Sequence, residues 1–333
     1  MLNGMTETPK QENRPRQAGK NRGLLGRAIR LLAFIIVVIT GIGAGVFLYY
    51  YHSSHTFKDT VNTVLSGADA PEKAFTGRSE INILLMGRDL DRDRYGRIVN
   101  THGRTDAMML AHIDFRNQSA HILSIPRDTL AHVPGYKGKR RISYANALGG
   151  PELARQTISE FLGIYPDYYL LVNFDGFEKA IDEIGGLEVA VDKKLDYDDN
   201  WGNLHIHLRP GKQLLNGEQC MGFVRYRQSK DGDAESDFVR IARQQEFLRT
   251  AREKLSSPSV MFRLPEVLDI IRNDIEGNLT FPQMICLARF IKTLPPESGI
   301  RMETLPALDG GGVFVRADPD ATRELLRQMF FNN

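Results

Sequence analysis

The sequence predicts an α/β protein: a central mixed β-sheet flanked by helices, forming an α/β/α sandwich, preceded by one N-terminal transmembrane helix. Beyond residue 80, apolar runs of strand length alternate with segments of helical periodicity. Before them lies a single uncharged apolar stretch, 31–51, long enough to cross a bilayer. The composition, 42% hydrophobic and 25% charged, is ordinary for a folded protein of one or two domains.

The first 51 residues predict a membrane anchor. Residues 1–30 hold a basic excess and are expected to form a disordered cytoplasmic leader. The run 31–51 is expected to be the transmembrane helix, and Tyr49, Tyr50 and Tyr51 resemble an interfacial aromatic belt. A cleaved signal peptide is the alternative, which the long leader disfavours. Because positive charge stays on the cytoplasmic side, we expect a single-pass protein of the cell membrane with its folded body outside.

An external location limits the chemistry that the body can perform. ATP is not expected outside the cell, so the energy for any synthetic reaction must arrive within an activated substrate. The net charge of +2 gives no reason to expect a nucleic-acid partner. Cys220 and Cys286 are too few for a disulfide framework and are expected to be buried free thiols.

The body is expected to follow a stalk at 52–79, which holds a weak helical stretch at 57–65, and to form one catalytic domain, 80–333. The expected strands are 81–86, 107–113, 121–125, 168–174, 187–191, 205–208 and 301–305. A turn at Asn117 and Gln118 should join the second and third as antiparallel neighbours. The expected helices open at Gly149-Gly150-Pro151 and lie at 176–184, 214–227, 238–255, 264–271 and 282–294, with a last one from Pro319. Asp175 is expected to cap the second helix, and 195–212 to be mainly a loop.

Arginine and aspartate gather beside these strands and helices. The clusters contain Arg88 and Asp89, Arg104 and Asp106, Arg127 and Asp128, Arg225 and Arg227, and the helical set Arg240, Arg243 and Gln244. Guanidinium forks suit phosphate oxygens, and carboxylates suit a hard divalent cation. Together they predict a pyrophosphate clamp with a bridging metal ion. Surface ion pairs or a solvated basic helix face are the alternative for any single cluster.

Three local patterns leave alternatives open. On a regular helix Arg225 and Arg227 would point about 200° apart, so they converge only where the helix has ended. His205 and His207 would share one side of a strand, but no third metal ligand is evident, which favours a solvent-facing pair. The apolar stripes in 262–271 and 281–291 are core packing by default and, alternatively, walls for a lipid tail.

As an ordered set, the motifs closely resemble the LytR–CpsA–Psr family of envelope phosphotransferases. The matching segments are 82–89, 104–110, 123–128, 149–153, 172–177, 208–211, 215–219, 224–227 and 237–245. Two positions depart from the family pattern. Arg141 stands where lysine is frequent, and Arg88 stands where a small polar residue is usual.

The resemblance implies an enzyme that transfers an anionic glycopolymer from a polyprenyl-pyrophosphate carrier to peptidoglycan, at the carbon 6 hydroxyl of muramic acid. It implies Mg²⁺ (or Mn²⁺) held by Asp89 and Asp106. The residues expected to face the pyrophosphate are Arg88, Arg104, Arg127, Arg141, Arg225, Arg227, Arg240, Arg243 and Gln244. Asp106 and Asp128 are both candidates for the base that activates the acceptor hydroxyl, with Arg127 as a catalytic neighbour. Membrane lipid is the other expected partner.

Two other functions remain in view. A hydrolase would use the same carrier, with water in place of the sugar hydroxyl. A membrane-bound transcriptional attenuator would need a cytoplasmic reader of DNA, and residues 1–30 contain no helix-turn-helix pattern. Sequence alone does not separate transfer from hydrolysis.

Overall fold

The computed structural model describes residues 20–88, 91–92, 98–100, 102–199, 204–226, 237–255, 257, 260, 263–295, 298–308 and 314–331. The chain divides into two compact units, Met1–His55 and Thr56–Asn333.

The first unit contains one long helix, α1 (Lys20–Ser53). Within it, Ile35–Ser53 is long and apolar enough to cross a membrane, judged by length and composition. The helix confirms an apolar N-terminal element and extends two residues beyond the predicted end of the span. The large apolar side chains from Ile35 to Tyr49 are exposed.

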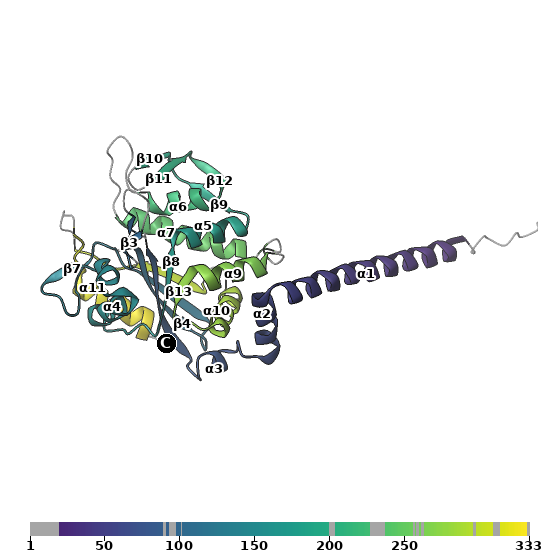
Figure 1. The fold of residues 1–333 in the computed structure, drawn as a ribbon, viewed down its shortest axis with the longest axis horizontal. Helices are drawn as coiled ribbons and strands as arrows, with labels where there is room; N and C mark the ends of the chain where they lie inside the picture. Colours follow the sequence, from purple (N-terminus) through teal and green to yellow (C-terminus); the bar gives the residue numbers. More distant parts are fainter. Residues whose placement is uncertain are drawn as a thin grey trace, which may run out of the picture. The chain divides into compact units, whose positions relative to one another are not determined.

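The body is built on a six-stranded mixed sheet in the order β13-β8-β1-β4-β5-β14 (Figure 1). The strands are β1 (Glu80–Arg88), β4 (Thr105–Asp114), β5 (Ser119–Ser124), β8 (Tyr168–Asn173), β13 (Ile275–Gly277) and β14 (Ile300–Thr304). β1 is antiparallel to β4 and parallel to β8, while β5 is antiparallel to β4 and parallel to β14. The predicted mixed sheet is confirmed, as is the antiparallel β4–β5 pair, whose turn places Gln118 at a φ of 50°.

Helices cover both faces of this sheet because its strands alternate in the direction of their apolar side chains. Leu84 and Met86 of β1 pack beneath α4 (Tyr144–Leu162), α11 (Pro319–Leu326) and the π-helical segment η1 (Arg327–Phe331). Ile81 and Ile83 point to the other face, where Phe290 of α10 (Phe281–Thr293) joins the same cluster. The flanking helices of the predicted sandwich are therefore confirmed.

A second group of elements packs around its own apolar core. It comprises α5 (Phe174–Glu183), β9 (Leu187–Val191), β10 (Leu195–Asp199), β11 (Leu204–Leu208), β12 (Gly211–Leu215), α6 (Gly217–Arg225), α7 (Asp237–Leu255) and α9 (Leu264–Asp274). β9 pairs with β12 and β10 with β11, both antiparallel. Two further short pairs are β2 (Asp91–Arg92) with β3 (Ile98–Asn100) and β6 (Leu130–His132) with β7 (Lys139–Arg141).

Four predictions of local structure are wrong. Leu214 and Leu215 belong to β12, and α6 begins at Gly217 because Asn216 and Gln219 form a capping box. The residue that caps α5 is Asn173, whose side chain accepts from the Gly176 amide, so Asp175 lies inside the helix. Residues 195–199 and 204–208 form a hairpin where mainly a loop was expected. A helical turn from Tyr144 precedes the kink at the two glycines before Pro151.

The segment expected to be a stalk contains two helices, α2 (His55–Ser66) and α3 (Pro71–Ala74). Phe75, which follows α3, is 0% exposed and lies in the same cluster as Ile81 and Ile83. Arg289 of α10 forms an ion pair with the buried Asp69. Packing onto the body therefore begins before β1, rather than at Ile81.

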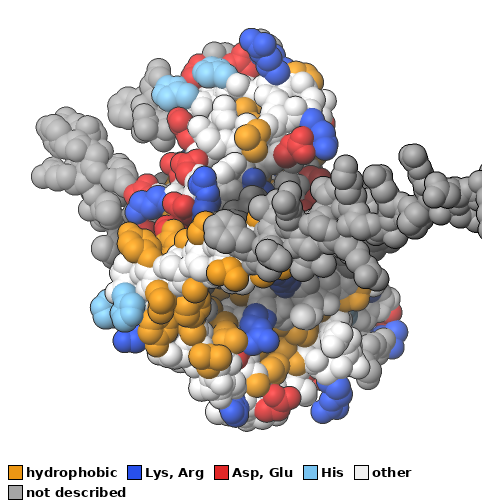
Figure 2. All heavy atoms as spheres, turned by 90° about the vertical axis from the view of Figure 1, so that its right-hand side faces the viewer, with side chains coloured by type: hydrophobic (Ala, Val, Ile, Leu, Met, Phe, Trp, Pro, Cys, Tyr) orange, Lys and Arg blue, Asp and Glu red, His pale blue; other side chains and the backbone are white. Residues whose placement is uncertain are grey.

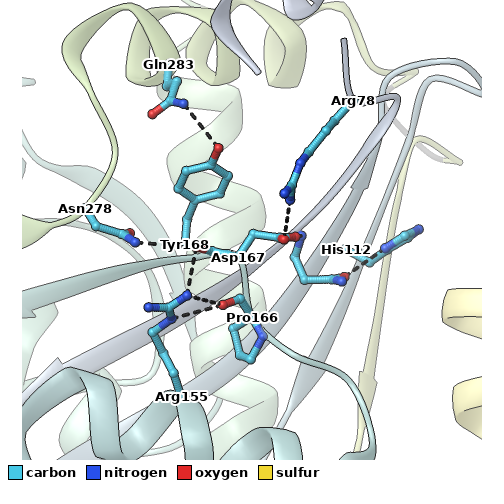
Figure 3. A network of polar contacts seen from close by, with 9 residues as sticks. Arg78, His112, Arg155, Pro166, Asp167, Tyr168, Asn278 and Gln283 are labelled. Atoms are coloured by element: carbon cyan, nitrogen blue, oxygen red, sulfur yellow. Dashed lines mark hydrogen bonds and ion pairs between the residues drawn. The ribbon is translucent and has the colours of Figure 1, made fainter. Parts of the chain in front are cut away.

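A polar network fixes the start of β8 (Figure 3). The carboxylate of Asp167 accepts a hydrogen bond from Arg78 and another, at 2.9 Å, from the amide of Asn82 in β1. Arg155 of α4 donates to the carbonyl of Pro166 at 2.9 and 2.8 Å. These contacts hold β8 in register beside β1, so the far ends of both strands reach the same edge of the sheet.

Candidate active site

A cavity of about 630 Å³ opens at one edge of the central sheet. The parallel strands β1 and β8 end there, and the antiparallel strand β4 begins there. α5, α6 and α7 complete the wall. The apolar side chains that line it are Leu85, Met86, Met109, Leu170, Val172, Phe174, Phe177, Met221, Val224, Phe247 and Leu248. This lining suits a hydrocarbon ligand.

A polar pocket of about 180 Å³ adjoins this apolar cavity. Asp106, Arg127 and Arg225 line both spaces. The other residues of the polar pocket are Arg104, Thr105, Asp128, Arg141, Ser143 and Tyr144. An apolar chain with a highly anionic end group would therefore find a matching surface for each part.

Backbone hydrogen bonds bring three distant segments together at the polar pocket. The amide of Thr105, at the start of β4, donates to the carbonyl of Ser143 at 3.3 Å. The amide of Ser143 donates to the carbonyl of Arg127 at 3.3 Å, and that of Ile142 to Thr129 at 2.8 Å. The side chains of these segments must therefore project into one small volume.

The charged groups of the pocket alternate in sign. Arg127 forms an ion pair with Asp106, and its Nε lies 3.8 Å from Oδ2 of Asp128. Nε of Arg141 lies 3.2 Å from Oδ1 of Asp128. Asp128 is thus held between two arginines, whereas Asp106 has one and lies where the two spaces meet. The positive charge of Arg104 and Arg225 adds to this row.

The end of α6 shows whether Arg225 lies on a regular helix or at a point where the helix has ended. The helix stops at Arg225, and Tyr226 already has extended backbone angles. The guanidinium carbon of Arg225 lies 4.2 Å from the centre of the Phe174 ring, which fixes the side chain over α5. Arg227 lies outside the described residues.

Helix α7 presents one face to the apolar cavity. Arg240, Gln244, Phe247 and Leu248 follow the spacing of a single helical stripe and all line the cavity. Arg243 instead donates to the carbonyl of Tyr226 at 3.1 Å. Arg240 and Arg243 are 3% and 6% exposed, so the alternative of a solvated basic face is wrong.

The predicted site residue Arg88, at the end of β1, does not line either space. Nη2 of Arg88 lies 3.1 Å from Oε2 of Glu276 in β13, and Arg88 lines neither space. Asp89 lies outside the described residues. Of the two expected metal ligands, the structure therefore places Asp106 alone.

The described carboxylates fit a Mg²⁺ site in which the substrate phosphates and water complete the coordination. Within the described ranges, no group of three or more histidine, cysteine or acidic side chains could hold a metal ion. Mg²⁺, however, is commonly bound by one or two carboxylates together with substrate phosphates and water. Asp106, at the junction of the two spaces, fits such a partial site.

The apolar wall was not identified from the sequence. Ile285 and Phe290 of α10 pack in the core of the sheet, so 281–291 is core and the tail-wall alternative is wrong for it. The wall comes instead from β8, α5, α6 and α7. Phe174 and Phe177, three apart at the start of α5, were the available signal for it.

The predicted solvent-facing histidine pair is confirmed. Nδ1 of His205 lies 2.8 Å from Asp198, and Nδ1 of His207 lies 2.9 Å from Asp196, across the β10–β11 hairpin. The two histidine side chains are 43% and 57% exposed. Figure 2 shows histidine beside acidic side chains at the top of the body, where Figure 1 places this hairpin.

The fold and the sequence are those of a family of cell-envelope transferases. The chain belongs to the LytR–CpsA–Psr family, whose sequence profile matches residues 47–322. Among its relatives is TagU of Bacillus mycoides, named a polyisoprenyl-teichoic acid–peptidoglycan teichoic acid transferase. It is 31% identical over 295 residues, which cover 87% of this chain and 92% of TagU.

The chain is also similar to two further proteins. "Regulatory protein MsrR" of Staphylococcus aureus is 37% identical over 202 residues, 60% of this chain, and the match spans only 57% of MsrR. The solved structure of TagT, a Bacillus subtilis transferase, bound to LI-WTA has a TM-score of 0.59 and 27% identity. It covers 76% of this chain and 90% of that of TagT.

Proposed function

We propose that this protein transfers an anionic glycopolymer from a polyprenyl-pyrophosphate carrier to a hydroxyl group of peptidoglycan. The observation that carries the proposal is the continuity of the apolar cavity with the arginine-lined pocket through Asp106, Arg127 and Arg225. A polyprenyl pyrophosphate has this same division between a hydrocarbon tail and a charged head. The transferase names of TagT and TagU, and the TagT structure bound to LI-WTA, support it.

The apolar cavity would hold the part of the polyprenyl chain next to the pyrophosphate. Each buried methylene contributes about 0.8 kcal/mol, so a few isoprene units supply most of the affinity. Phe174 of α5 and Phe247 of α7 both line this wall. With α1 in the membrane and the body outside the cell, the tail would reach the cavity from the bilayer.

The arginines of the polar pocket would bind the pyrophosphate and neutralise the charge that develops on the leaving group. Four arginines line the polar pocket: Arg104, Arg127, Arg141 and Arg225. Arg240 of α7 lines the adjoining apolar cavity. We propose that Asp106, with Asp89, would hold Mg²⁺ or Mn²⁺. When bound, that ion would supply Lewis-acid stabilisation of the transferring phosphoryl group.

In the reaction, the acceptor oxygen forms a bond to the phosphorus that carries the glycopolymer, and the bond from that phosphorus to polyprenyl phosphate breaks. The proton of the acceptor hydroxyl passes to a carboxylate. Asp106 and Asp128 are the two candidates, and both line the polar pocket. Asp128, held by Arg127 and Arg141, orients these two arginines.

The test uses the full-length protein in detergent with a radiolabelled polyprenyl-pyrophosphate glycopolymer, assayed with and without peptidoglycan. Label should become attached to peptidoglycan, and Asp106→Asn should abolish attachment, whereas the surface substitution Asp196→Asn should not. Release of free glycopolymer without an acceptor, at an equal rate, would identify a hydrolase instead. Wild-type transfer by Asp106→Asn would overturn the proposed site.

A further inference from the structure

A third cavity, of about 720 Å³, lies beside the β6–β7 hairpin and shares no lining residue with the two spaces of the candidate active site. We call it the hairpin cavity. The end of α4 and the helix α11 form its other sides, and Figure 1 shows β7, α4 and α11 close together. Its apolar floor is formed by Leu130, Phe161, Leu162 and Leu326.

The mouth of the hairpin cavity is positively charged. Lys139 and Arg316 line it, and neither forms an ion pair with another described residue. Arg323 lines it too, and its charge is shared with Asp320 at 3.1 Å. Two carboxylates that adjoin lining residues in the sequence have other partners: Glu160 lies 3.0 Å from His132, and Asp318 caps α11.

A buried hydroxyl group also lacks a partner here. Thr322, which lines the hairpin cavity, is 9% exposed, and its Oγ1 has no hydrogen-bond partner among the described residues. Leaving such a group unpaired costs about 1–3 kcal/mol. A bound ligand with a polar group would satisfy it, so the cavity combines an apolar floor, an unsatisfied hydroxyl and free cations.

Two chain segments lead from the hairpin cavity to the polar pocket. Lys139 and Arg141 are two apart on β7, so they share a face of the strand, roughly 7 Å apart. Arg141 lines the polar pocket, and its guanidinium carbon lies 5.1 Å from the centre of the Phe314 ring. Arg316 of the hairpin cavity follows Phe314 by two residues. A ligand in the hairpin cavity therefore lies next to the side of the polar pocket that is formed by Arg141.

We propose that the hairpin cavity binds the acceptor, an acidic glycopeptide segment of peptidoglycan. The inference rests on the proposed transfer reaction, in which two substrates must meet at the polar pocket. The carrier already accounts for the apolar cavity and the arginines. A stem peptide offers free carboxylates for Lys139 and Arg316, and methyl and acetyl groups for the apolar floor. A polyol phosphate chain of the donor would use the cations but leave Leu130, Phe161 and Leu326 without an apolar partner.

The test measures transfer as a function of the concentration of soluble, uncrosslinked peptidoglycan oligomers with free stem carboxylates. We expect Lys139→Glu and Arg316→Glu each to raise the KM for the acceptor tenfold or more, and Thr322→Val to raise it severalfold. The kcat at saturating acceptor and the KM for the lipid donor should be unchanged. Lys212→Glu, an exposed lysine on β12, is the matched control.

Oligomers whose stem carboxylates are amidated should bind wild-type protein as weakly as oligomers with free stem carboxylates bind Lys139→Glu. In Lys139→Glu, amidation of the oligomers should cause no further loss of affinity. An unchanged acceptor KM in all three variants would overturn the proposal. A rise in the donor KM alone would assign the cavity to the phosphodiesters of the glycopolymer and overturn it equally. Binding of the oligomers followed by ligand-observed NMR, without donor, separates failure of this site from failure of the transferase proposal.

Discussion

At the scale of single residues, the net positive charge of the polar pocket arises because it contains fewer carboxylates than arginines. Arg127 and Arg141 both contact Asp128, and Arg127 also pairs with Asp106. Two carboxylates among four lining arginines leave a net positive pocket, which favours a pyrophosphate over a neutral sugar. The positions of Asp106, Arg127 and Asp128 near strand ends were predictable from the sequence. The sequence did not predict that Asp128 is held between two guanidinium groups, because one of them comes from Arg141 of the β6–β7 hairpin.

Arg225 tests the contribution of a single pyrophosphate contact. Arg225→Ala should weaken binding of a fluorescent polyprenyl pyrophosphate by roughly 1.5–3 kcal/mol, since it removes a charge-assisted contact. Arg225→Lys keeps the charge but loses the planar stack on Phe174, so it should recover only part of the affinity. Arg209→Ala, an exposed arginine outside both spaces, serves as the control. Equal Kd values for all four proteins would show that Arg225 does not face the pyrophosphate.

The two cysteines provide a test of burial. Both are free and buried, which confirms the prediction. Burial raises the pKa of Cys220 to about 12 and that of Cys286 to about 11. Because the thiolate is the reactive form, iodoacetamide at about pH 8 should label neither thiol in the folded protein and both in denaturant. Mass spectrometry of the intact chain measures this. Rapid labelling of the native protein would contradict the buried positions.

At the scale of elements, the close approach of α5 and α6 supports the wall of the apolar cavity. The structure brings Gly217, the first residue of α6, against the backbone of Glu178 in α5. The sequence predicted a helix here but placed its start too early. Leu214 and Leu215 fit a helical stripe as well as a strand, and the pairing of β12 with β9, which is a tertiary contact, decides between them.

Gly217→Ala should therefore destabilise the protein. An added Cβ would collide with the carbonyl oxygen of Glu178 and lie 2.7 Å from its Cα, so α5 and α6 must separate. We expect a loss of about 1–3 kcal/mol in the free energy of unfolding, measured with urea. Gly222→Ala in the same helix is the matched control. Its Cβ would meet the Ile206 side chain at 3.2 Å, which can move, and the loss should be smaller. An equal or larger loss for Gly222→Ala would contradict the close approach.

At the scale of the whole molecule, the sheet and its flanking helices were predictable because apolar periodicity directly encodes which faces are buried. The location of the apolar cavity was not. Its lining combines side chains from β1, β8 and α7, which are separated by long stretches of sequence. The hairpin cavity was missed for the same reason, since Lys139, Phe161 and Arg316 meet only through tertiary packing.

The stability of the body should fall in mild acid because of His112. Burial lowers the pKa of this imidazole below its ordinary 6.5, and His121 adds to the effect, while Glu80, Asp114 and Asp167 oppose it. The unfolded chain therefore takes up a proton as the pH falls through 6.5, before the folded protein does. The free energy of unfolding should decrease from about pH 7.5 to about pH 5.5.

His112→Gln removes this titration, so its loss of stability over the same interval should be smaller than that of the wild type. Urea unfolding at both pH values measures the change in the free energy of unfolding for each protein. His132→Gln, which changes an exposed histidine of β6, controls for the removal of a histidine elsewhere. Parallel pH dependence of the wild type and His112→Gln would show that the buried imidazole does not control acid stability.

The parallel pairing of β5 with β14 has a consequence for biosynthesis. Ile300 pairs with Ala120, so the two partners are made far apart in time. Until β14 is synthesised, β5 has no neighbour on one side and exposes a row of unpaired amides and carbonyls. Contacts between such distant segments also slow folding. The nascent chain thus passes through a long interval with an open sheet edge, during which it is exposed to aggregation through that edge.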